Sequence, residues 1–167
     1  MKLVITYAVA GLHMNIKQLK PFNPILGETY EGFWPDGTQI YIEHMSHHPP
    51  ISRFLLMSEN NWRFYGYYEY VAKLKGFTGN VIGGCFKGPN IVDFGNGDTI
   101  TFNLPSQNIT GLMYGKRIIE WEGRMDFYDS KNNIHASLVF TESPSFFQKF
   151  REPTDVFRGE IRQDDRV

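Results

Sequence analysis

Two short stretches of the sequence carry side chains that could bind an anion together. KPFNPILGE contains Lys20 and Asn23, and EHMSHHPP, further along, contains the adjacent pair His47 and His48. Each proline fixes its own φ and restricts the residue before it, so both stretches are predicted to be stiff. Ammonium, amide and imidazole groups all donate hydrogen bonds, and converging donors of this kind bind phosphate. Spacing alone does not show convergence, and side chains that cap their own loops are the alternative.

The same histidines are candidates for a metal site. His44, His47 and His48, with Glu43, supply suitable donor atoms. Neighbouring residues of an extended strand face opposite ways, however, and a zinc site needs three or four converging ligands. No second ligand cluster stands elsewhere in the sequence, so we predict no metal and no other cofactor.

Nucleophilic catalysis has weak support in the sequence. Ser46 precedes a histidine, but adjacency does not give triad geometry, and there is no G-x-S-x-G elbow. Cys85, in VIGGCFKG, is interpreted as a small buried strand residue beside glycines that form a bulge. Glu120 and Glu122 share a strand face, which is ordinary for exposed carboxylates. We predict that the protein is not an enzyme. The alternative is a barrel hydrolase in which His47 or His48 acts as a base near Ser46.

The composition limits the partners and the compartment. The 17 basic residues nearly balance the 18 acidic ones, so the chain lacks the overall positive charge of a general nucleic-acid binder. The single cysteine excludes an internal disulfide and suits a reducing compartment. No apolar run is long enough to span a bilayer. The chain is predicted to be cytoplasmic.

The first residues, MKLVITYAVAG, are similar to a signal peptide, but their apolar core is shorter than such a signal needs. The pattern instead predicts a buried helix that ends before Pro21, with Leu3, Ala8, Gly11 and Leu12 on one face.

Beyond Pro24 the sequence predicts short antiparallel strands joined by tight turns. Each turn contains the residue types that hairpins need, and a last strand is predicted at residues 157–162. Aromatic residues make up 16% of the chain, and many alternate with polar ones. Ordinary core packing explains each of them singly, but a wide aromatic sheet also curls readily around an apolar ligand. The predicted turns are Pro35–Gly37, Ser58–Asn61, Asn96–Asp98 and Ser130–Asn133.

KPFNPILGETYE followed by EHMSHHPPIS resembles the paired signature of the oxysterol-binding protein family, a glutamate and, after a short gap, Ser-His-His-Pro-Pro. Further similarity runs through WRFYGYYEYVAKLKGFTGN and ITFNLPSQNITGLMYGKRIIEWEG, so the resemblance covers most of the chain. The glutamine that usually follows the signature glutamate is His44 here.

The resemblance implies an all-β-dominated fold, an incomplete antiparallel β-barrel that encloses a lipid tunnel, with a short N-terminal helix. It implies binding of phosphatidylinositol 4-phosphate at the tunnel mouth, a sterol or phosphatidylserine as the other lipid, and lipid transfer between membranes that the protein contacts peripherally. By position in the motifs, Lys20, Asn23, His47 and His48 match the residues that bind the headgroup.

The chain departs from the family pattern at both ends. Family members carry an N-terminal lid and a C-terminal region with further phosphate ligands, and neither is found here, so residues 1–167 are expected to be one incomplete lipid-binding domain. The basic residues of the tail match no family ligand and are expected to be solvated, to face a membrane or to cover a sheet edge. A truncated lipid sensor or scaffold that does not transfer lipid is the first alternative, and a secreted lipocalin-like carrier is a weaker one. The tail residues are Lys149, Arg151, Arg158, Arg162 and Arg166.

Overall fold

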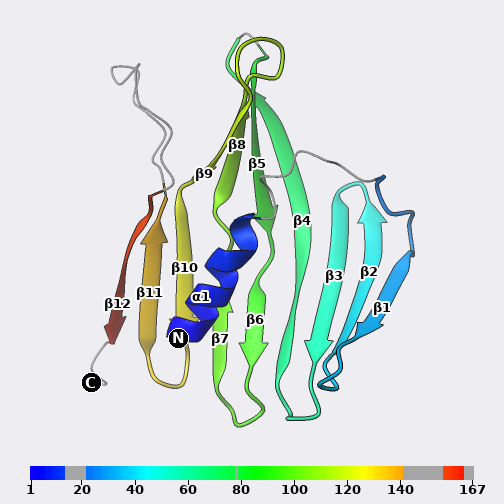
Figure 1. Cartoon of the computed structure of the whole chain (residues 1–167), viewed down its shortest axis with the longest axis vertical. Helices are drawn as coiled ribbons and strands as arrows, with labels where there is room; N and C mark the ends of the chain where they lie inside the picture. Colours follow the sequence, from blue (N-terminus) through cyan, green and yellow to red (C-terminus); the bar gives the residue numbers. More distant parts are fainter. Residues whose placement is uncertain (14–21, 78, 141–155, 164–167) are drawn as a thin grey trace.

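The structure is a computed structural model that describes residues 1–13, 22–77, 79–140 and 156–163. Within these residues a helix lies against one face of a sheet of 12 antiparallel strands (Figure 1). The helix is α1 (Lys2–Gly11), and the strands are β1 (Thr29–Phe33), β2 (Gln39–His47), β3 (Pro50–Met57), β4 (Arg63–Lys75), β5 (Val81–Lys87), β6 (Asn90–Asp93), β7 (Thr99–Phe102), β8 (Ser106–Thr110), β9 (Ile118–Glu122), β10 (Arg124–Asp129), β11 (Ile134–Val139) and β12 (Arg158–Gln163).

The predicted hairpins are confirmed. The turns at 35–37, 58–61, 96–98 and 130–133 join β1 to β2, β3 to β4, β6 to β7 and β10 to β11. The last strand is also confirmed, because β12 pairs with β11 along its whole length. The bulge predicted beside Cys85 is wrong: β5 pairs with β4 in regular register, and Cys85 is only half-buried.

The N-terminal helix is confirmed, but its buried face differs from the prediction. Val4 and Ala8 are buried, as is Leu12 just after the helix, whereas Leu3 is 85% exposed and Gly11 is exposed. Residues four apart lie on the same side of a helix, and Leu3 stands five residues before Ala8, which turns it away from that side. Of the residues predicted to share a buried face with Ala8, only Leu12 is therefore confirmed.

The sheet forks at the long strand β4. Its first residues, Arg63–Gly66, pair with β6, and its later residues, Glu69–Lys75, pair with β5. Strand β5 continues through β8 to β9, while β6 continues through β7 to β10 and β11. Gly66 lies beside the fork, where a Cβ atom would stand 2.2 Å from the carbonyl oxygen of Pro89. A side chain at this position would therefore force the two branches apart.

The face of the sheet toward α1, here called the inner face, carries the hydrophobic core. Phe102 and Phe127 are directly paired on β7 and β10, stack at 5.1 Å between ring centroids, and are 5% and 1% exposed. Val4, Ala8 and Leu12 of the helix segment join the same cluster. The core is thus concentrated where α1 covers the sheet.

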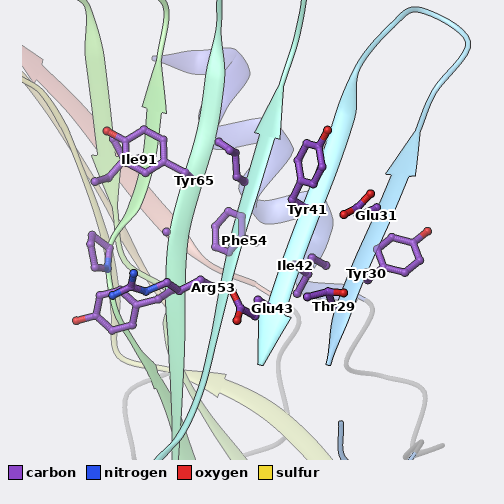
Figure 2. A pocket seen from close by; sticks show the side chains of 14 residues that line it. Thr29, Tyr30, Glu31, Tyr41, Ile42, Glu43, Arg53, Phe54, Tyr65 and Ile91 are labelled. Atoms are coloured by element: carbon purple, nitrogen blue, oxygen red, sulfur yellow. The ribbon is translucent and has the colours of Figure 1, made fainter. Parts of the chain in front are cut away.

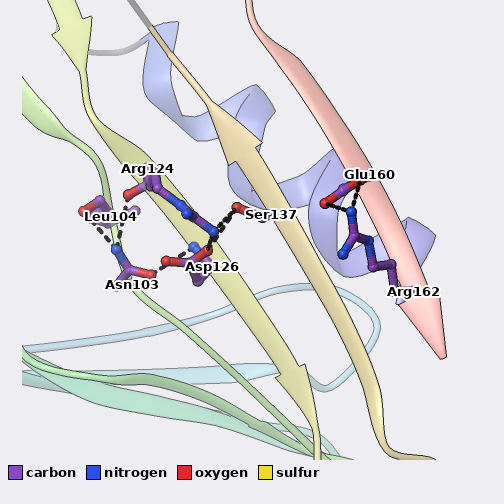
Figure 3. A network of polar contacts seen from close by, with 7 residues as sticks. All are labelled: Asn103, Leu104, Arg124, Asp126, Ser137, Glu160 and Arg162. Atoms are coloured by element: carbon purple, nitrogen blue, oxygen red, sulfur yellow. Dashed lines mark hydrogen bonds and ion pairs between the residues drawn. The ribbon is translucent and has the colours of Figure 1, made fainter. Parts of the chain in front are cut away.

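The opposite, outer face of the same strands is polar (Figure 3). Arg124 and Asp126 alternate along β10 with the buried Met125 and Phe127, as a half-buried strand requires. The Ser137 hydroxyl accepts a hydrogen bond from Arg124 at 2.8 Å and donates one to Asp126 at 2.8 Å. Alternation along β10 and β11 therefore separates core from solvent, and the ligand-binding candidates must be sought at the uncovered parts of the sheet.

Candidate functional site

The two motifs identified in the sequence meet at one edge of the sheet. Strand β1 begins directly after the KPFNPILGE segment and pairs with β2, with Thr29 opposite Glu43. Just before it, the Gly27 amide donates to the His44 carbonyl at 2.8 Å, and the His44 amide donates to the Glu28 carbonyl at 2.9 Å. The loop that contains Asn23 is therefore fixed against the strand that ends in His47.

The histidine pair lies where the chain leaves regular strand geometry. The register between β2 and β3 shifts between His44 and Ser46, and the chain turns at His48 and Pro49, whose peptide bond is cis. The rings of His47 and His48 lie 6.3 Å apart between centroids, tilted by 49°. Both side chains are exposed at this turn. The bulge and the turn thus keep two adjacent imidazoles close together instead of on opposite faces.

The structure describes one of the two remaining predicted headgroup residues. Asn23 is exposed in the loop before β1. Lys20 lies outside the described residues. Convergence of all four side chains on one ligand therefore stays a prediction.

His44 is the residue of this region whose role the sequence did not reveal. It is 6% exposed, and its Nε2 atom lies 2.8 Å from Nδ1 of His47. Its Nδ1 atom lies 2.9 Å from the Ser52 hydroxyl on β3. The sequence signal for this contact was the spacing of three residues between the two histidines. Their side chains lie on the same side of the strand only because of the bulge.

A pocket of about 410 Å³ lies between α1 and the inner face of the sheet. Aromatic and aliphatic side chains predominate in its lining: Tyr7, Ala8, Ala10, Gly11, Leu12, Phe64, Tyr68, Phe86, Asn90, Phe102, Leu104 and Trp121. An apolar lining with few polar atoms is typical of a pocket for a lipid or another apolar molecule.

One polar pair in the pocket joins the half-buried Tyr68 to the buried Asn90. The Tyr68 hydroxyl donates to Oδ1 of Asn90 at 2.6 Å, and the Asn90 amide donates to the Phe102 carbonyl at 3.3 Å. Burial, with a smaller contribution from Tyr7, raises the pKa of Tyr68 to about 12. Tyr68 therefore remains an uncharged donor at neutral pH and keeps Asn90 in place.

The histidines and this pocket belong to the same face. His44 pairs with Ser52, and Ser52 pairs with Tyr68, so the three side chains form one cross-strand row on the inner face. Strands are spaced by about 4.8 Å, which puts the His44 position about 10 Å from Tyr68. A ligand with a polar end at the β2–β3 turn could therefore extend its apolar part toward the pocket beneath α1.

A larger pocket, about 580 Å³, lies on the outer face of β1–β4 and β6 (Figure 2). Tyr41, Leu55 and Tyr65 line it in one cross-strand row, and Glu43 and Arg53 in the next. These rows alternate with the inner-face row that contains Phe54. Tyr30, Ile42 and Phe54 of the inner-face row also line the larger pocket. The smaller pocket contains Tyr68, which lies in the cross-strand row of His44, and is covered by α1, so we assign the candidate site to it.

The residues considered for catalysis have structural contacts. The serine that contacts an imidazole is Ser52, not Ser46. Glu122 accepts hydrogen bonds from Asn108 and, at 3.2 Å, from Lys75. In the described part of the chain, no three His, Cys, Asp or Glu side chains gather as a metal ion would require. Nor do the described helices include one with the length and hydropathy of a membrane span.

The tail contributes little to this region in the described residues. Arg162 on β12 pairs with Glu160 at 2.8 Å (Figure 3). Arg158 pairs in register with Val139 on the same edge of the sheet. Lys149, Arg151 and Arg166, like the segment expected to wrap the sheet edge, lie outside the described residues.

An open antiparallel sheet with an apolar pocket under a helix defines a ligand-binding β protein of the incomplete-barrel class. The chain belongs to the oxysterol-binding protein family, whose model matches residues 1–166. Oxysterol-binding protein 9 of Dictyostelium discoideum is 40% identical over an alignment of 167 positions, which covers 96% of this chain and 38% of that protein. Human oxysterol-binding protein-related protein 5 is 33% identical over an alignment of 153 positions, which covers 87% of this chain and 17% of that protein. The family resemblance drawn from the motifs is thereby confirmed.

Solved structures support the fold. The Osh3 ORD of Saccharomyces cerevisiae, in complex with PI(4)P, matches 88% of this chain and 40% of that chain, with a TM-score of 0.75 and 24% identity. The Osh1 ORD in complex with ergosterol matches 96% of this chain and 37% of that chain, with a TM-score of 0.77 and 24% identity. The predicted incomplete antiparallel barrel with an N-terminal helix is confirmed. This chain spans about two fifths of the length of these structures.

Proposed function

We propose that this chain binds phosphatidylinositol 4-phosphate and, alternatively, a sterol or another lipid such as phosphatidylserine, and that it transfers them between cytosolic membrane faces. The headgroup would be bound by Lys20, Asn23, His47 and His48. The observation that carries the proposal is the exposed histidine pair at the β2–β3 turn, whose His47 is bonded to His44 in the cross-strand row that leads to Tyr68 of the apolar pocket. Related solved domains contain PI(4)P or a sterol, which supports this choice of ligands.

The two parts of the site would contribute differently to binding. Burial of lipid tails in an apolar pocket is favourable by about 25 cal/mol per Å² and does not depend on the headgroup. Hydrogen bonds from imidazole and ammonium groups to a phosphate are charge-assisted and directional. Selectivity for a phosphorylated lipid would therefore come from the β2–β3 turn with His47 and His48, here called the histidine turn. Most of the affinity would come from the pocket.

Two hairpin tips lie at the same end of the sheet as the β2–β3 turn, and their side chains support contact with a membrane surface. Strand β4 continues past the β2–β3 turn to Lys75 (Figure 1). Phe77 at the tip after β4, and Met113 and Tyr114 at the tip between β8 and β9, are 111%, 76% and 60% exposed. Asn80 joins the two tips, because its Oδ1 atom accepts from the Met113 amide at 2.8 Å.

The charge of these tips suits anionic lipids. Residues 70–82 and 109–119 include Lys73, Lys75, Lys116 and Arg117 and contain no Asp or Glu. Exposed apolar side chains surrounded by basic ones favour the interface of an anionic membrane. We therefore propose that these tips make the peripheral membrane contact during transfer.

The test is extraction of labelled phosphatidylinositol 4-phosphate from liposomes by the purified chain and by its His47→Ala/His48→Ala variant. Two lost charge-assisted hydrogen bonds of about 1.5–3 kcal/mol each predict at least a ~100-fold loss of affinity, which removes extraction. His135→Ala, which removes an exposed histidine of β11, is the matched control and should extract like the wild type. Undiminished extraction by a folded double variant would contradict the assignment.

The same experiment separates the alternative, a lipid sensor that does not transfer its ligand. The open sheet favours this reading, because Tyr30 on the inner-face side of β1 is 60% exposed instead of enclosed. A sensor would bind vesicles in a histidine-dependent manner while leaving the labelled lipid in the membrane. Labelled lipid that becomes soluble with the protein would exclude it.

A further inference from the structure

The buried histidine next to the proposed phosphate-binding pair has a geometry that the pair alone does not explain. His44 has hydrogen-bonding neighbours at both ring nitrogens, Ser52 at 2.9 Å and His47 at 2.8 Å. The rings of His44 and His47 lie 4.8 Å apart between centroids, at 62° to each other. The backbone of His44 is also bonded on its other side, to Gly27 and Glu28. His44 is thus fixed by β3 and by the loop before β1 before any ligand arrives.

The three side chains form a hydrogen-bonded series with two possible proton arrangements when both imidazoles are neutral. In the first, the Ser52 hydroxyl donates to Nδ1 of His44, and the N–H at Nε2 of His44 donates to Nδ1 of His47. His47 then carries its own hydrogen on Nε2. In the second, every bond is reversed, and Nε2 of His47 has no hydrogen.

A phosphate distinguishes between these arrangements. Its ionised oxygens only accept hydrogen bonds, so a neutral His47 can bind it through Nε2 only if that atom carries the hydrogen. An imidazole whose tautomer is already correct loses no free energy to rearrangement when the ligand binds. The partner of Nδ1 is Nε2 of His44, so the tautomer of His47 follows from whether His44 donates or accepts in this bond.

We propose that His44 is a positioning residue, which donates a hydrogen bond to Nδ1 of His47 and so holds the Nε2–H of His47 ready for a phosphate oxygen. This inference takes its ligand, a phosphate, from the proposed function. The proton arrangement of the two histidines does not depend on that function. His44 itself does not touch the ligand in this account. Its effect passes through the ring of His47.

The first test is the tautomer of His47 in the free wild-type chain, read from the ¹⁵N shifts of its ring by NMR at pH about 9, where imidazoles are neutral. We expect the Nε2–H tautomer for His47 and a hydrogen on Nε2 of His44. The Nδ1–H tautomer of His47 would overturn the proposal. This measurement needs no variant and no ligand.

The second test compares two substitutions of the buried ring. The amide of His44→Gln can still donate to Nδ1 of His47, whereas His44→Leu cannot. Titration with a water-soluble, short-chain phosphatidylinositol 4-phosphate should show ~10-fold weaker binding for His44→Leu, the loss of about one hydrogen bond, and within ~3-fold of wild type for His44→Gln. His47 should become a mixture of tautomers in His44→Leu only, which a purely structural role of His44 would not produce.

The outcomes separate the inference from the proposed function. Equal binding by the wild type and a folded His44→Leu variant would overturn the role of His44 while leaving the lipid site intact. A wild-type chain that binds no short-chain lipid, yet shows the expected tautomer, would contradict the proposed function instead. If His44→Leu does not fold, Ser52→Ala replaces it: loss of the Ser52 donor should reduce the Nε2–H population of His47, and an unchanged population would count against the proposal.

Discussion

One row of side chains crosses the inner face of the sheet, and its two ends differ sharply. The row runs in register through Phe127, Phe102, Asn90, Gly66, Phe54, Ile42 and Tyr30. Phe127 is 1% exposed, and Tyr30, at the other end, is 60% exposed. Both are aromatic residues on the same face of the same sheet. Burial therefore depends on what covers the strand, and here α1 packs on the end near β7, β10 and β11, with Tyr7 reaching Phe64 on β4.

The difference assigns two tasks to the two ends. The covered end supplies most of the hydrophobic stabilisation, while the uncovered end leaves the histidine turn and the loop before β1 accessible. The pocket beneath α1 extends from Phe102 at the covered end to Tyr68, which lies in the cross-strand row of His44. We expect the two ends to differ in energy as much as they differ in exposure.

The largest effect is expected from removing matched aromatic rings at the two ends. Phe127→Ala should reduce the free energy of unfolding by about 3–5 kcal/mol, because it leaves a cavity in the packed core. Tyr30→Ala should change it by less than about 1 kcal/mol, since the ring is mostly in water already. Urea unfolding followed by circular dichroism measures both. Equal losses would mean that the β1 end is packed as tightly as the covered end.

A smaller effect is expected from adding a methyl group at two glycines of the sheet. At Gly66 a Cβ atom would meet the Pro89 carbonyl oxygen at 2.2 Å, so Gly66→Ala should destabilise the fold by about 1–3 kcal/mol. At Gly32, on β1, the nearest atoms are the movable side chains of Tyr30 and Ile40, at 3.1 and 3.2 Å. Gly32→Ala should therefore be the milder change in the same unfolding assay. The reverse order would show that the fork at β4 adapts more easily than the uncovered edge.

The smallest effect concerns the exposed hairpin tips and should leave stability unchanged. Phe77→Ser/Met113→Ser removes apolar groups that face solvent, and binding to vesicles with phosphatidylserine should weaken by ~10-fold. Leu3→Ser removes a similarly exposed group from the start of α1, far from these tips (Figure 1), and is the control. Co-sedimentation with vesicles measures the three proteins. Equal weakening by Leu3→Ser would mean that general hydrophobicity, not these tips, determines membrane binding.

Much of the fold could be predicted because its signals are local. The turns contain residue types that define hairpins within a few positions, and each predicted turn joins two strands. The fork at β4 could not be predicted in this way, because one strand pairs with β6 and β5 over different residues. Such pairing depends on the twist of the whole sheet and on a close approach at Gly66, neither of which has a local sequence signal.

The site was predicted in part for the same reason. The motifs indicated His47 and His48, which lie at the β2–β3 turn, just after a register shift between His44 and Ser46. The bond between His44 and His47 could not be predicted, because a regular strand would turn residues three apart to opposite faces. The helix face was misjudged at Leu3, since several apolar residues in a short helix allow more than one face.

The central claim is that the lipid lies on the inner face, with its headgroup at the β2–β3 turn and its tails beneath α1. Titration of the ¹⁵N- and ¹³C-labelled chain with short-chain phosphatidylinositol 4-phosphate tests it directly by NMR. We expect shifts at the rings of His47 and His48 and intermolecular contacts between the acyl chains and Phe64, Tyr68 or Phe86. Contacts confined to Tyr41 and Tyr65 in the larger outer pocket, with unchanged histidine signals, would contradict the claim.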